Sequence, residues 1–453
     1  MMMRLSEAAR VLGARLHGDD AAFDAVSTDT RAIRPGDLFI ALKGERFDAH
    51  AFVGEAAGAG AAAALVDRVC DAPIPQLIVA DTLAALAALG RHWRQRFDIP
   101  LIAITGSNGK TTVKEMLAAI LRAAAGNDAV LATRGNLNNH IGVPLMLLEL
   151  RARHRYAAIE LGMNHPGEIA QLAAIAQPTV ALVNNAQREH MEFMASVEAV
   201  AQENAAVFAA LPADGIAVIN ADDAHAGDFR RAAGAHRIVD FGLENPAAVG
   251  GGYVLKNLSS EIYLRTPAGE ASATPAIPGL HNVRNALAAC ACAHAVGIAP
   301  AVMCEGLNNF RPYTGRLQVK RALNGATVID DTYNANPDSV RAAIDVLAEC
   351  APPTVLVLGD MGEVGEHGVE FHREVGAYAR NRNVSSLCAI GAQSGAAAGA
   401  FGAAGTHADS IEQLLERVKA SATPQATLLI KGSRFMRMER VVNALTGDNG
   451  GAH

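Results

Sequence analysis

The feature that most constrains this fold is one stretch, residues 100–113, which reads PLIAITGSNGKTTV. Leu101 to Ile104 form an apolar run typical of a buried strand, and residues 114–121 have the apolar spacing of a helix. Between them the chain turns on Gly106 and Gly109. A strand, a glycine turn and a helix form an anion site, because the helix N-terminus offers backbone N–H groups and the positive end of its dipole. The stretch therefore predicts a phosphate-binding loop.

Two side chains of this loop have the chemistry that a nucleoside triphosphate needs. Lys110 can reach the outer phosphates, and the Thr111 hydroxyl can ligate Mg²⁺. The general P-loop pattern has its first glycine five residues before the second, but here that position, counted back from Gly109, is Ile104. A glycine-rich turn with a chance Lys-Thr pair is the plainer alternative. The strand and helix on either side favour an ATP site.

The length and composition bound the class of protein. The chain has 453 residues, enough for about three domains at ~150 residues each. A net charge of −7 argues against nucleic acid as the main partner, since phosphate backbones are held by an excess of Lys and Arg. The six cysteines are scattered without a C-x-x-C pair, which indicates a reduced, cytoplasmic setting. The start of the chain lacks a signal-type apolar core, and the Ala- and Gly-rich residues 56–66 are too few to span a membrane.

Apolar runs alternate with helical patterns along the whole chain. We expect an N-terminal α/β domain at 1–97, a central ATP-binding domain at 98–313 and a C-terminal Rossmann-like domain at 314–453. Strands are expected at 37–42, 63–66, 77–79, 156–161, 179–183, 215–220, 327–331, 354–358, 385–390 and 427–430. The alternation predicts an α/β fold with a doubly wound, mostly parallel central sheet.

Helices are expected between these strands, and the chain end is expected to be disordered. Ser6 should cap a helix from Glu7 to Leu12, residues 50–60 should form a second helix, and residues 410–420 another. The glycine-containing tail, residues 447–453, has the composition of a disordered terminus. The last domain has a Rossmann-type pattern, but no Gly-x-Gly-x-x-Gly follows its first strand.

Polar residues lie near the ends of four central strands: Thr105, Glu160, Asn184 and Asn220. Ligands of parallel sheets bind at the carboxyl ends of the strands, so one cleft could gather these side chains. Glu160 is the best second metal ligand after Thr111, and His190 is a third candidate. An ordinary strand-end carboxylate and a structural histidine are the plainer alternatives.

Two α/β domains beside one ATP site suit an enzyme that brings two substrates to one phosphate. ATP could activate a carboxylate as an acyl phosphate, which an amine then attacks, with proximity in a closing cleft supplying much of the rate. A P-loop switch that uses ATP as a signal is the alternative from another class of protein.

Several motifs, taken in order, resemble the Mur ligases, the cytoplasmic ligases of peptidoglycan precursors. The resemblance covers essentially the whole chain and rests on residues 105–112, 160–164, 279–285, 315–317 and 431–434. The runs DDTYNANPDS at 330–339 and GDMGEVG at 359–365 are most similar to the member that adds D-alanyl-D-alanine to UDP-N-acetylmuramoyl-tripeptide. The Asp-Asn-Pro-Arg motif of the ligase that adds a diamino acid is absent. A folylpolyglutamate synthetase-like ligase shares the last two domains, but the separate first domain counts against it.

The resemblance implies a role for individual residues. The residues implied to bind ATP are Gly106, Ser107, Asn108, Gly109, Lys110, Thr111, Thr112, Asn282, Asn285, Arg316 and Asp331. Those implied to act in catalysis are Lys110, Glu160 and His190, and those implied to hold Mg²⁺ are Thr111, Glu160 and His190. Those implied to bind the UDP-linked peptide and the dipeptide are Asp29, Thr30, Arg31, Lys43, Asn138, Asn139, Asn334, Asn336 and Ser339. Turn or capping duty is the alternative for the asparagines. A monomer is also implied.

One departure concerns a carbamylated lysine that many Mur ligases carry about fourteen residues after the histidine. Counting from His190 leads to Asn204, and no lysine occurs anywhere from Glu115 to Leu255. This chain therefore cannot form that carbamate at the matching place. We expect other groups to hold the second metal there, with Glu203 or a water on Asn204 as candidates.

Overall fold

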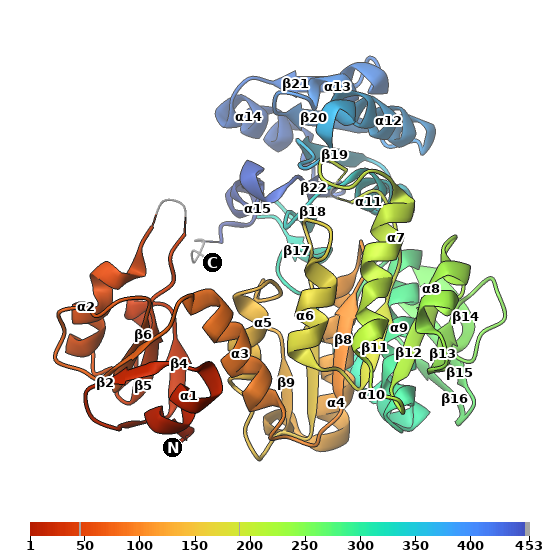
Figure 1. The fold of residues 1–453 in the computed structure, drawn as a ribbon. Coiled ribbons are helices and arrows are strands. Elements are labelled where there is room, and N and C mark those ends of the chain that lie inside the picture. The colour runs from red at the N-terminus through yellow and green to blue at the C-terminus, as the bar shows by residue number, and fades with distance from the viewer. Residues whose placement is uncertain (45–46, 190, 449–453) are drawn as a thin grey trace.

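The computed structural model describes residues 1–44, 47–189 and 191–448. Three α/β units follow one another along the chain, with the first beside the middle unit and the third above the end of the middle sheet (Figure 1). The predicted fold class is confirmed. Among the described residues, no helix combines the length and apolar character needed to cross a membrane.

The first unit is a five-stranded sheet in the order β2-β7-β6-β5-β4. Its strands are β2 (Arg15–His17), β4 (Ala25–Ser27), β5 (Asp37–Ile40), β6 (Ala63–Val66) and β7 (Gln76–Ile78), and only β2 runs antiparallel to its neighbour. Its α-helices are α1 (Leu5–Leu12), α2 (Val53–Gly58) and α3 (Thr82–Arg94). The unit's single tryptophan, Trp93 on α3, donates its indole N–H to the Leu150 carbonyl at 3.0 Å, which attaches this unit to the middle one.

Two expectations for this unit were wrong in detail. Ser6 does not cap the first helix: α1 begins at Leu5 after Arg4, and the Ser6 hydroxyl donates to Asp20 Oδ2 at 3.0 Å. The helix expected at residues 50–60 is divided into a 3₁₀ turn (Ala49–Phe52) and α2. Asp48 causes the break, because its carboxylate accepts the His50 N–H and starts the tighter turn.

The middle unit is a fully parallel sheet in the order β13-β12-β11-β8-β10-β9. Its strands are β8 (Leu101–Thr105), β9 (Val130–Ala132), β10 (Tyr156–Glu160), β11 (Val180–Val183), β12 (Ile216–Asn220) and β13 (Arg237–Phe241). Its α-helices are α4 (Lys110–Ala125), α5 (Gly142–Leu147), α6 (Glu168–Ala176), α7 (Val197–Ala205), α8 (Ala226–Ala233), α9 (Leu280–Ala295) and α10 (Pro300–Asn309). Every residue of β8 is buried, as its unbroken apolar run requires.

A three-stranded antiparallel sheet, β14 (Gly250–Lys256), β15 (Ser259–Thr266) and β16 (Gly269–Ala273), follows the middle sheet and was not predicted. Buried and exposed residues alternate along β15, whose inner side chains Ile262 and Leu264 join the core against α9 and α10. The alternation in EIYLRT was the signal available in the sequence.

The third unit is a sheet in the order β17-β18-β22-β19-β20-β21, with only β17 antiparallel. Its strands are β17 (Gln318–Arg321), β18 (Thr327–Asp331), β19 (Thr354–Gly359), β20 (Ser386–Ile390), β21 (Gly405–Ala408) and β22 (Thr427–Lys431). Its α-helices are α11 (Pro337–Ala348), α12 (Gly368–Asn381), α13 (Gly395–Phe401), α14 (Ile411–Ser421) and α15 (Glu439–Thr446). One apolar core runs from α9 of the middle unit to α11 and α12, so the two units pack directly. The tail expected to be disordered falls largely on residues 449–453, which lie outside the described residues.

Candidate functional site

The phosphate loop joins β8 to α4, as its sequence predicts. Gly106 and Gly109 have φ angles of +130° and +83°, a region that L side chains rarely adopt. A Cβ atom on Gly109 would also lie 2.3 Å from Asn285 Oδ1. Glycine is therefore required at Gly109 for two independent reasons, conformation and space.

The segment that follows β11 is hydrogen-bonded along the whole loop. Asn108 N–H donates to Asn185 Oδ1 at 2.8 Å, and Asn184 Nδ2 donates to the Asn108 carbonyl at 2.8 Å. Gln187 N–H donates to Ser107 Oγ at 2.9 Å. These bonds fix the loop without using the N–H groups at the start of α4, which leaves those groups available for an anion.

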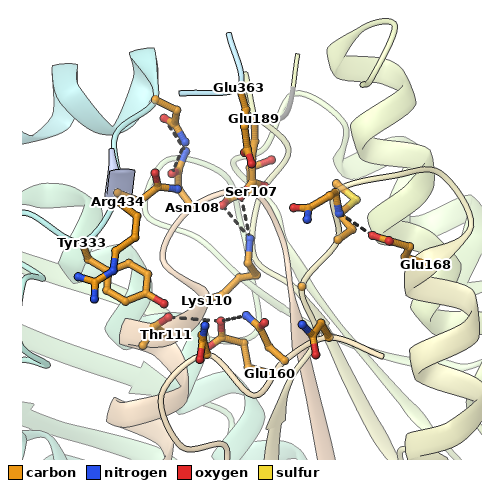
Figure 2. Close-up of a pocket in the computed structure, with 18 of the residues that line it drawn as sticks. Ser107, Asn108, Lys110, Thr111, Glu160, Glu168, Glu189, Tyr333, Glu363 and Arg434 are labelled. Carbon is orange, nitrogen blue, oxygen red and sulfur yellow. Dashed lines mark hydrogen bonds and ion pairs between the residues drawn. The ribbon is translucent and has the colours of Figure 1, made fainter. Parts of the chain in front are cut away.

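The Lys110 ammonium lies inside the loop rather than in solvent. Its Nζ donates to the carbonyls of Gly106 and Ser107 at 2.5 and 3.0 Å and lies 3.0 Å from Glu189 Oε1 (Figure 2). A cation held in this way is close to the helix N-terminus and oriented toward the cleft. It can exchange the carboxylate for a phosphate oxygen without a large movement.

Thr111 and Glu160 meet below Lys110, as the metal prediction requires (Figure 2). Thr111 Oγ1 donates to Glu160 Oε1 at 3.3 Å, and Asn138 Nδ2 donates to the same oxygen at 2.8 Å. Glu160 is 2% exposed, and its Oε2 is buried without a hydrogen-bond partner. An unpartnered buried carboxylate oxygen beside a threonine hydroxyl fits Mg²⁺, which prefers oxygen ligands.

The third predicted metal ligand, His190, lies outside the described residues. Among the residues that the structure describes, no three His, Cys, Asp or Glu side chains converge as a metal centre. Oxygens of phosphate and water are further ligands that a cation at Thr111 and Glu160 could take.

The two candidates for replacing the carbamylated lysine are engaged elsewhere, which corrects that expectation. The Glu203 carboxylate accepts the N–H groups of Gly167 and Ile169, both at 2.8 Å, and so caps the start of α6. Asn204 is 0% exposed; its Oδ1 accepts the Thr105 hydroxyl at 2.6 Å and its Nδ2 donates to the Val200 carbonyl. Asn204 therefore attaches α7 to the last residue of β8.

This arrangement predicts that turnover is independent of carbon dioxide. Asn204 is held by two hydrogen bonds, and a carbamate would need a lysine that residues 115–255 lack. Stripping CO₂ and bicarbonate from the assay should leave the rate of ADP release unchanged within error. Loss of turnover that added bicarbonate restores would contradict this prediction.

A cleft of about 360 Å³ lies behind the loop and joins residues that the resemblance assigned to ATP. Its walls include Gly109, Thr112, Asn282, Asn285, Arg316 and Asp331. Asn285 accepts from Asn184 Nδ2 at 3.0 Å and donates to Asn282 Oδ1 at 3.1 Å, so the two asparagines belong to one network with the loop.

Asp331 is held by a buried lysine that the site prediction omitted. Lys431 Nζ lies 2.5 Å from Asp331 Oδ2 and also donates to the Asn334 carbonyl at 2.9 Å. Burial lowers the pKa of Lys431, and the nearby Asp331 opposes this shift. In the sequence, the motif at 431–434 indicates family resemblance but no role for its lysine. The ion pair with Asp331, 100 positions earlier, explains why a lysine stands there.

A larger cleft of about 720 Å³ opens on the other side of the loop. Lys110, Thr111 and Glu160 form one wall, and Tyr333 and Arg434 form the facing wall (Figure 2). Other predicted residues that line it are Ser107, Asn108, Asn138, Asn139, Asn334, Asn336 and Ser339. The two clefts share a boundary at the loop, so a nucleotide in the smaller cleft would direct its phosphates into the larger one.

Two arginines of the third unit face this cleft, and only the first was predicted. Arg316 lines both clefts, with its guanidinium carbon 4.1 Å from the Tyr333 ring centre and its buried Nε without a hydrogen-bond partner. Arg434 lies 5.9 Å from the same ring and lines the larger cleft. Both are placed to meet anionic groups of substrates.

The residues expected to seat the dipeptide have structural duties as well. Asn336 and Ser339 form the capping box of α11, in which Asn336 Oδ1 accepts the Ser339 N–H at 2.8 Å. Asn336 Nδ2 also donates to Asn108 Oδ1 at 2.9 Å, across the two units. Asn334 Oδ1 accepts the Ala335 N–H. The capping alternative is therefore present at two of the three positions, although all three line the cleft.

The polar residues predicted to bind the UDP end are not brought into either cleft. Asp29 caps a short 3₁₀ turn (Thr30–Ala32) and pairs with Arg31 at 2.7 Å, and Lys43 forms a β-bridge with Asp48. Their role stays a prediction.

His372 supports the segment directly before Gly362 and Glu363, which line the larger cleft. It is 0% exposed; Met361 N–H donates to its Nε2 at 3.0 Å, and its Nδ1 lies 2.6 Å from the Gly368 carbonyl oxygen. This arrangement needs a neutral imidazole with the proton on Nδ1. Burial accordingly lowers the pKa of His372.

A pH dependence of stability follows from His372. The unfolded chain binds a proton there below about pH 6.5, whereas the folded state resists it, so acidification destabilises the fold by up to about 1.4 kcal/mol per pH unit. We expect His372→Gln to flatten the loss of unfolding free energy between about pH 6.5 and 5. Urea unfolding across this range measures the slope, with the 71% exposed His367, changed to Gln, as control. Parallel wild-type and His372→Gln curves would contradict this.

Comparisons with known proteins cover the whole chain. Profiles of the Mur ligase family catalytic domain, the Mur ligase middle domain and the Mur ligase glutamate ligase domain match residues 22–94, 104–293 and 315–434. The chain is 42% identical over 448 residues to the UDP-N-acetylmuramoyl-tripeptide–D-alanyl-D-alanine ligase of Escherichia coli K12, covering 97% of this chain and 98% of that protein.

Solved structures agree with the sequence matches. MurF from Acinetobacter baumannii superposes with a TM-score of 0.92 at 35% identity, covering 99% of this chain and 100% of that one. MurF ligase from Thermotoga maritima in complex with ADP superposes with a TM-score of 0.80 at 25% identity, covering 93% and 96%. Since profiles, whole-length identity and structure all agree, the chain belongs to the Mur ligase family.

Proposed function

We propose that the chain is an ATP-dependent ligase that joins D-alanyl-D-alanine to UDP-N-acetylmuramoyl-tripeptide in peptidoglycan precursor synthesis. The observation that carries the proposal is the shared cleft, in which Lys110 and Thr111 of the middle unit face Arg316 and Arg434 of the third. The Escherichia coli relative is named for this reaction, and its alignment with this chain covers 97% of the chain, including parts of all three units.

The reaction would proceed in two steps. A carboxylate oxygen of the tripeptide attacks the γ-phosphorus of ATP, ADP leaves, and an acyl phosphate forms. The amino group of the dipeptide then attacks the acyl carbon, loses a proton, and expels inorganic phosphate. Lys110 would neutralise negative charge on the transferred phosphoryl group. Arg316 lines both clefts, so it would lie beside the phosphates that extend from the smaller cleft into the larger one.

Thr111 and Glu160 would hold Mg²⁺ in this site. When bound, the ion supplies positive charge against the phosphate oxygens. Asn138 orients Glu160 by its 2.8 Å hydrogen bond, and Asn204 indirectly supports the same edge through Thr105. These two asparagines thereby fix the carboxylate and the end of β8.

The substrates' outer parts are assigned by charge and position. We place the dipeptide carboxylate at Arg434, the one arginine of the KGSR motif, because it faces the cleft opposite Lys110. We place the UDP group in the first unit, near Asp29–Arg31 and Lys43. The division at 97/98 and 313/314 stays part of the proposal. ATP and UDP-linked substrates imply the cytoplasm, and the family resemblance implies a monomer.

Release of ADP and phosphate tests the function. It should require both a UDP-muramoyl tripeptide and D-alanyl-D-alanine, with tripeptides ending in diaminopimelate and in lysine assayed side by side. ATP hydrolysis indifferent to both substrates would support a P-loop switch instead. Turnover with a folyl substrate and glutamate would support the folylpolyglutamate synthetase-like alternative.

A further inference from the structure

Arg188 joins the middle unit to the third unit beside the smaller cleft, which its partner Asp338 lines. It follows β11, and its Nη2 lies 2.6 Å from Asp338 Oδ1 on α11 while its Nη1 lies 2.8 Å from Glu374 Oε2 on α12. Its backbone N–H also donates to Asp338 Oδ2 at 3.0 Å. The guanidinium carbon is 5.3 Å from the Phe371 ring centre. One side chain therefore contacts two helices of the neighbouring unit.

The charges in this contact balance. Arg341 Nη1 lies 3.1 Å from Glu374 Oε1, so two arginines face two carboxylates. We call these four residues, Arg188, Asp338, Glu374 and Arg341, the Arg188 network. Its bidentate geometry and its 23% exposed Arg188 side chain make it stronger than an isolated surface ion pair, though still sensitive to salt.

The residues directly before and after Arg188 hold the phosphate loop. Gln187 N–H donates to Ser107 Oγ at 2.9 Å, and the carboxylate of Glu189 lies 3.0 Å from Lys110 Nζ. The segment 187–189 is therefore attached to the loop on one side and to the third unit on the other. A shift of the third unit relative to the middle one would be transmitted through Arg188 to Lys110.

We propose that Arg188 is a positioning residue that couples docking of the third unit to the placement of the phosphate loop, and hence to phosphoryl transfer. The proposal rests on the ligase function proposed above. Of the network's four residues, only Asp338 lines one of the two clefts, so Arg188 and Glu374 would affect the reaction through docking and not through substrate contact. Because the dipeptide would bind between the two units, we expect loss of Arg188 to lower kcat/KM most for the dipeptide.

Arg188→Met tests this, because methionine keeps an apolar stem against Phe371 and removes the charge. We expect kcat/KM for the dipeptide to fall about tenfold, equivalent to about 1.4 kcal/mol, with a smaller change in KM for the UDP-linked peptide. Arg382→Met is the matched control, since Arg382 pairs with Asp345 at 2.9 Å within the third unit alone. An unchanged kcat/KM, or an equal loss in Arg382→Met, would overturn the proposal. Arg188→Lys, which keeps the charge, should restore part of the rate.

A double-mutant cycle and a measurement of shape separate coupling from simple damage. Glu374→Gln alone should lower kcat/KM, but should add little in the Arg188→Met background; independent, additive losses would overturn the coupling.

Small-angle scattering with ADP bound should show a larger radius of gyration for Arg188→Met than for wild type, and an equal radius would contradict docking. If wild-type protein compacts but shows no dipeptide-dependent ADP release, the ligase function fails while the docking role stands.

Discussion

Replacing Lys110 with alanine should reduce kcat for ligation by about 10²–10³-fold. The ammonium lies within 3.0 Å of two loop carbonyls and of Glu189. It is therefore already placed at the N-terminus of α4, where phosphate charge must be neutralised. Without it, the cleft loses the cation that lies beside Glu189 at the place where the γ-phosphate would bind. Substrate-dependent release of ADP measures the effect.

The control for Lys110→Ala is Lys419→Ala, which removes an exposed lysine from α14. It should keep wild-type turnover, and both variants should fold, because the Lys110 ammonium contacts polar groups of the loop and of Glu189 and not an apolar core. Turnover of Lys110→Ala near the wild-type rate would remove the phosphate loop from the mechanism. Lys110→Arg should also be slow, since a planar guanidinium does not replace a compact ammonium inside a glycine turn.

The loop was predictable because its determinants are adjacent in sequence. An apolar strand, two glycines and a lysine within 13 residues define the turn whatever surrounds it, and the structure has each in its expected place. Glu160 was predictable for a related reason: parallel strands end at one edge, so a carboxylate at a strand end meets the loop. Its contact with Thr111 joins residues 49 positions apart.

Contacts that depend on the packing of units could not be predicted in the same way. Asn336 has a capping pattern in its sequence, but its bond to Asn108 spans 228 positions. In the sequence, Asn204 only marks the position where a metal-holding lysine is missing. In the structure it accepts a buried hydrogen bond from the Thr105 hydroxyl. Ser6 fits an N-cap by residue type, but Asp20 takes its hydroxyl. In each case a partner distant in sequence determines the outcome.

Glu160→Gln should reduce kcat by about 10²-fold and raise the Mg²⁺ concentration needed for half-maximal rate. Glutamine keeps the shape and can still accept the Asn138 amide, so the change removes charge without opening a cavity. The control is Glu168→Gln in the same cleft, where the carboxylate accepts the backbone N–H groups of Asn164 and His165. This control should leave the Mg²⁺ dependence unchanged.

Thermal unfolding gives the Glu160 prediction a readout that does not depend on turnover. Glu160 Oε2 is buried without a partner, and burying an uncompensated charge is costly, so Glu160→Gln should unfold at a higher temperature than wild type in the presence of a chelator. Added Mg²⁺ with ADP should then stabilise wild type more than the variant, because stabilisation by a ligand grows with the logarithm of its concentration divided by its dissociation constant. The difference between the two melting temperatures should therefore shrink or change sign when metal is added. If Mg²⁺ shifts both proteins equally, Glu160 is a strand-end carboxylate and the ion is held elsewhere.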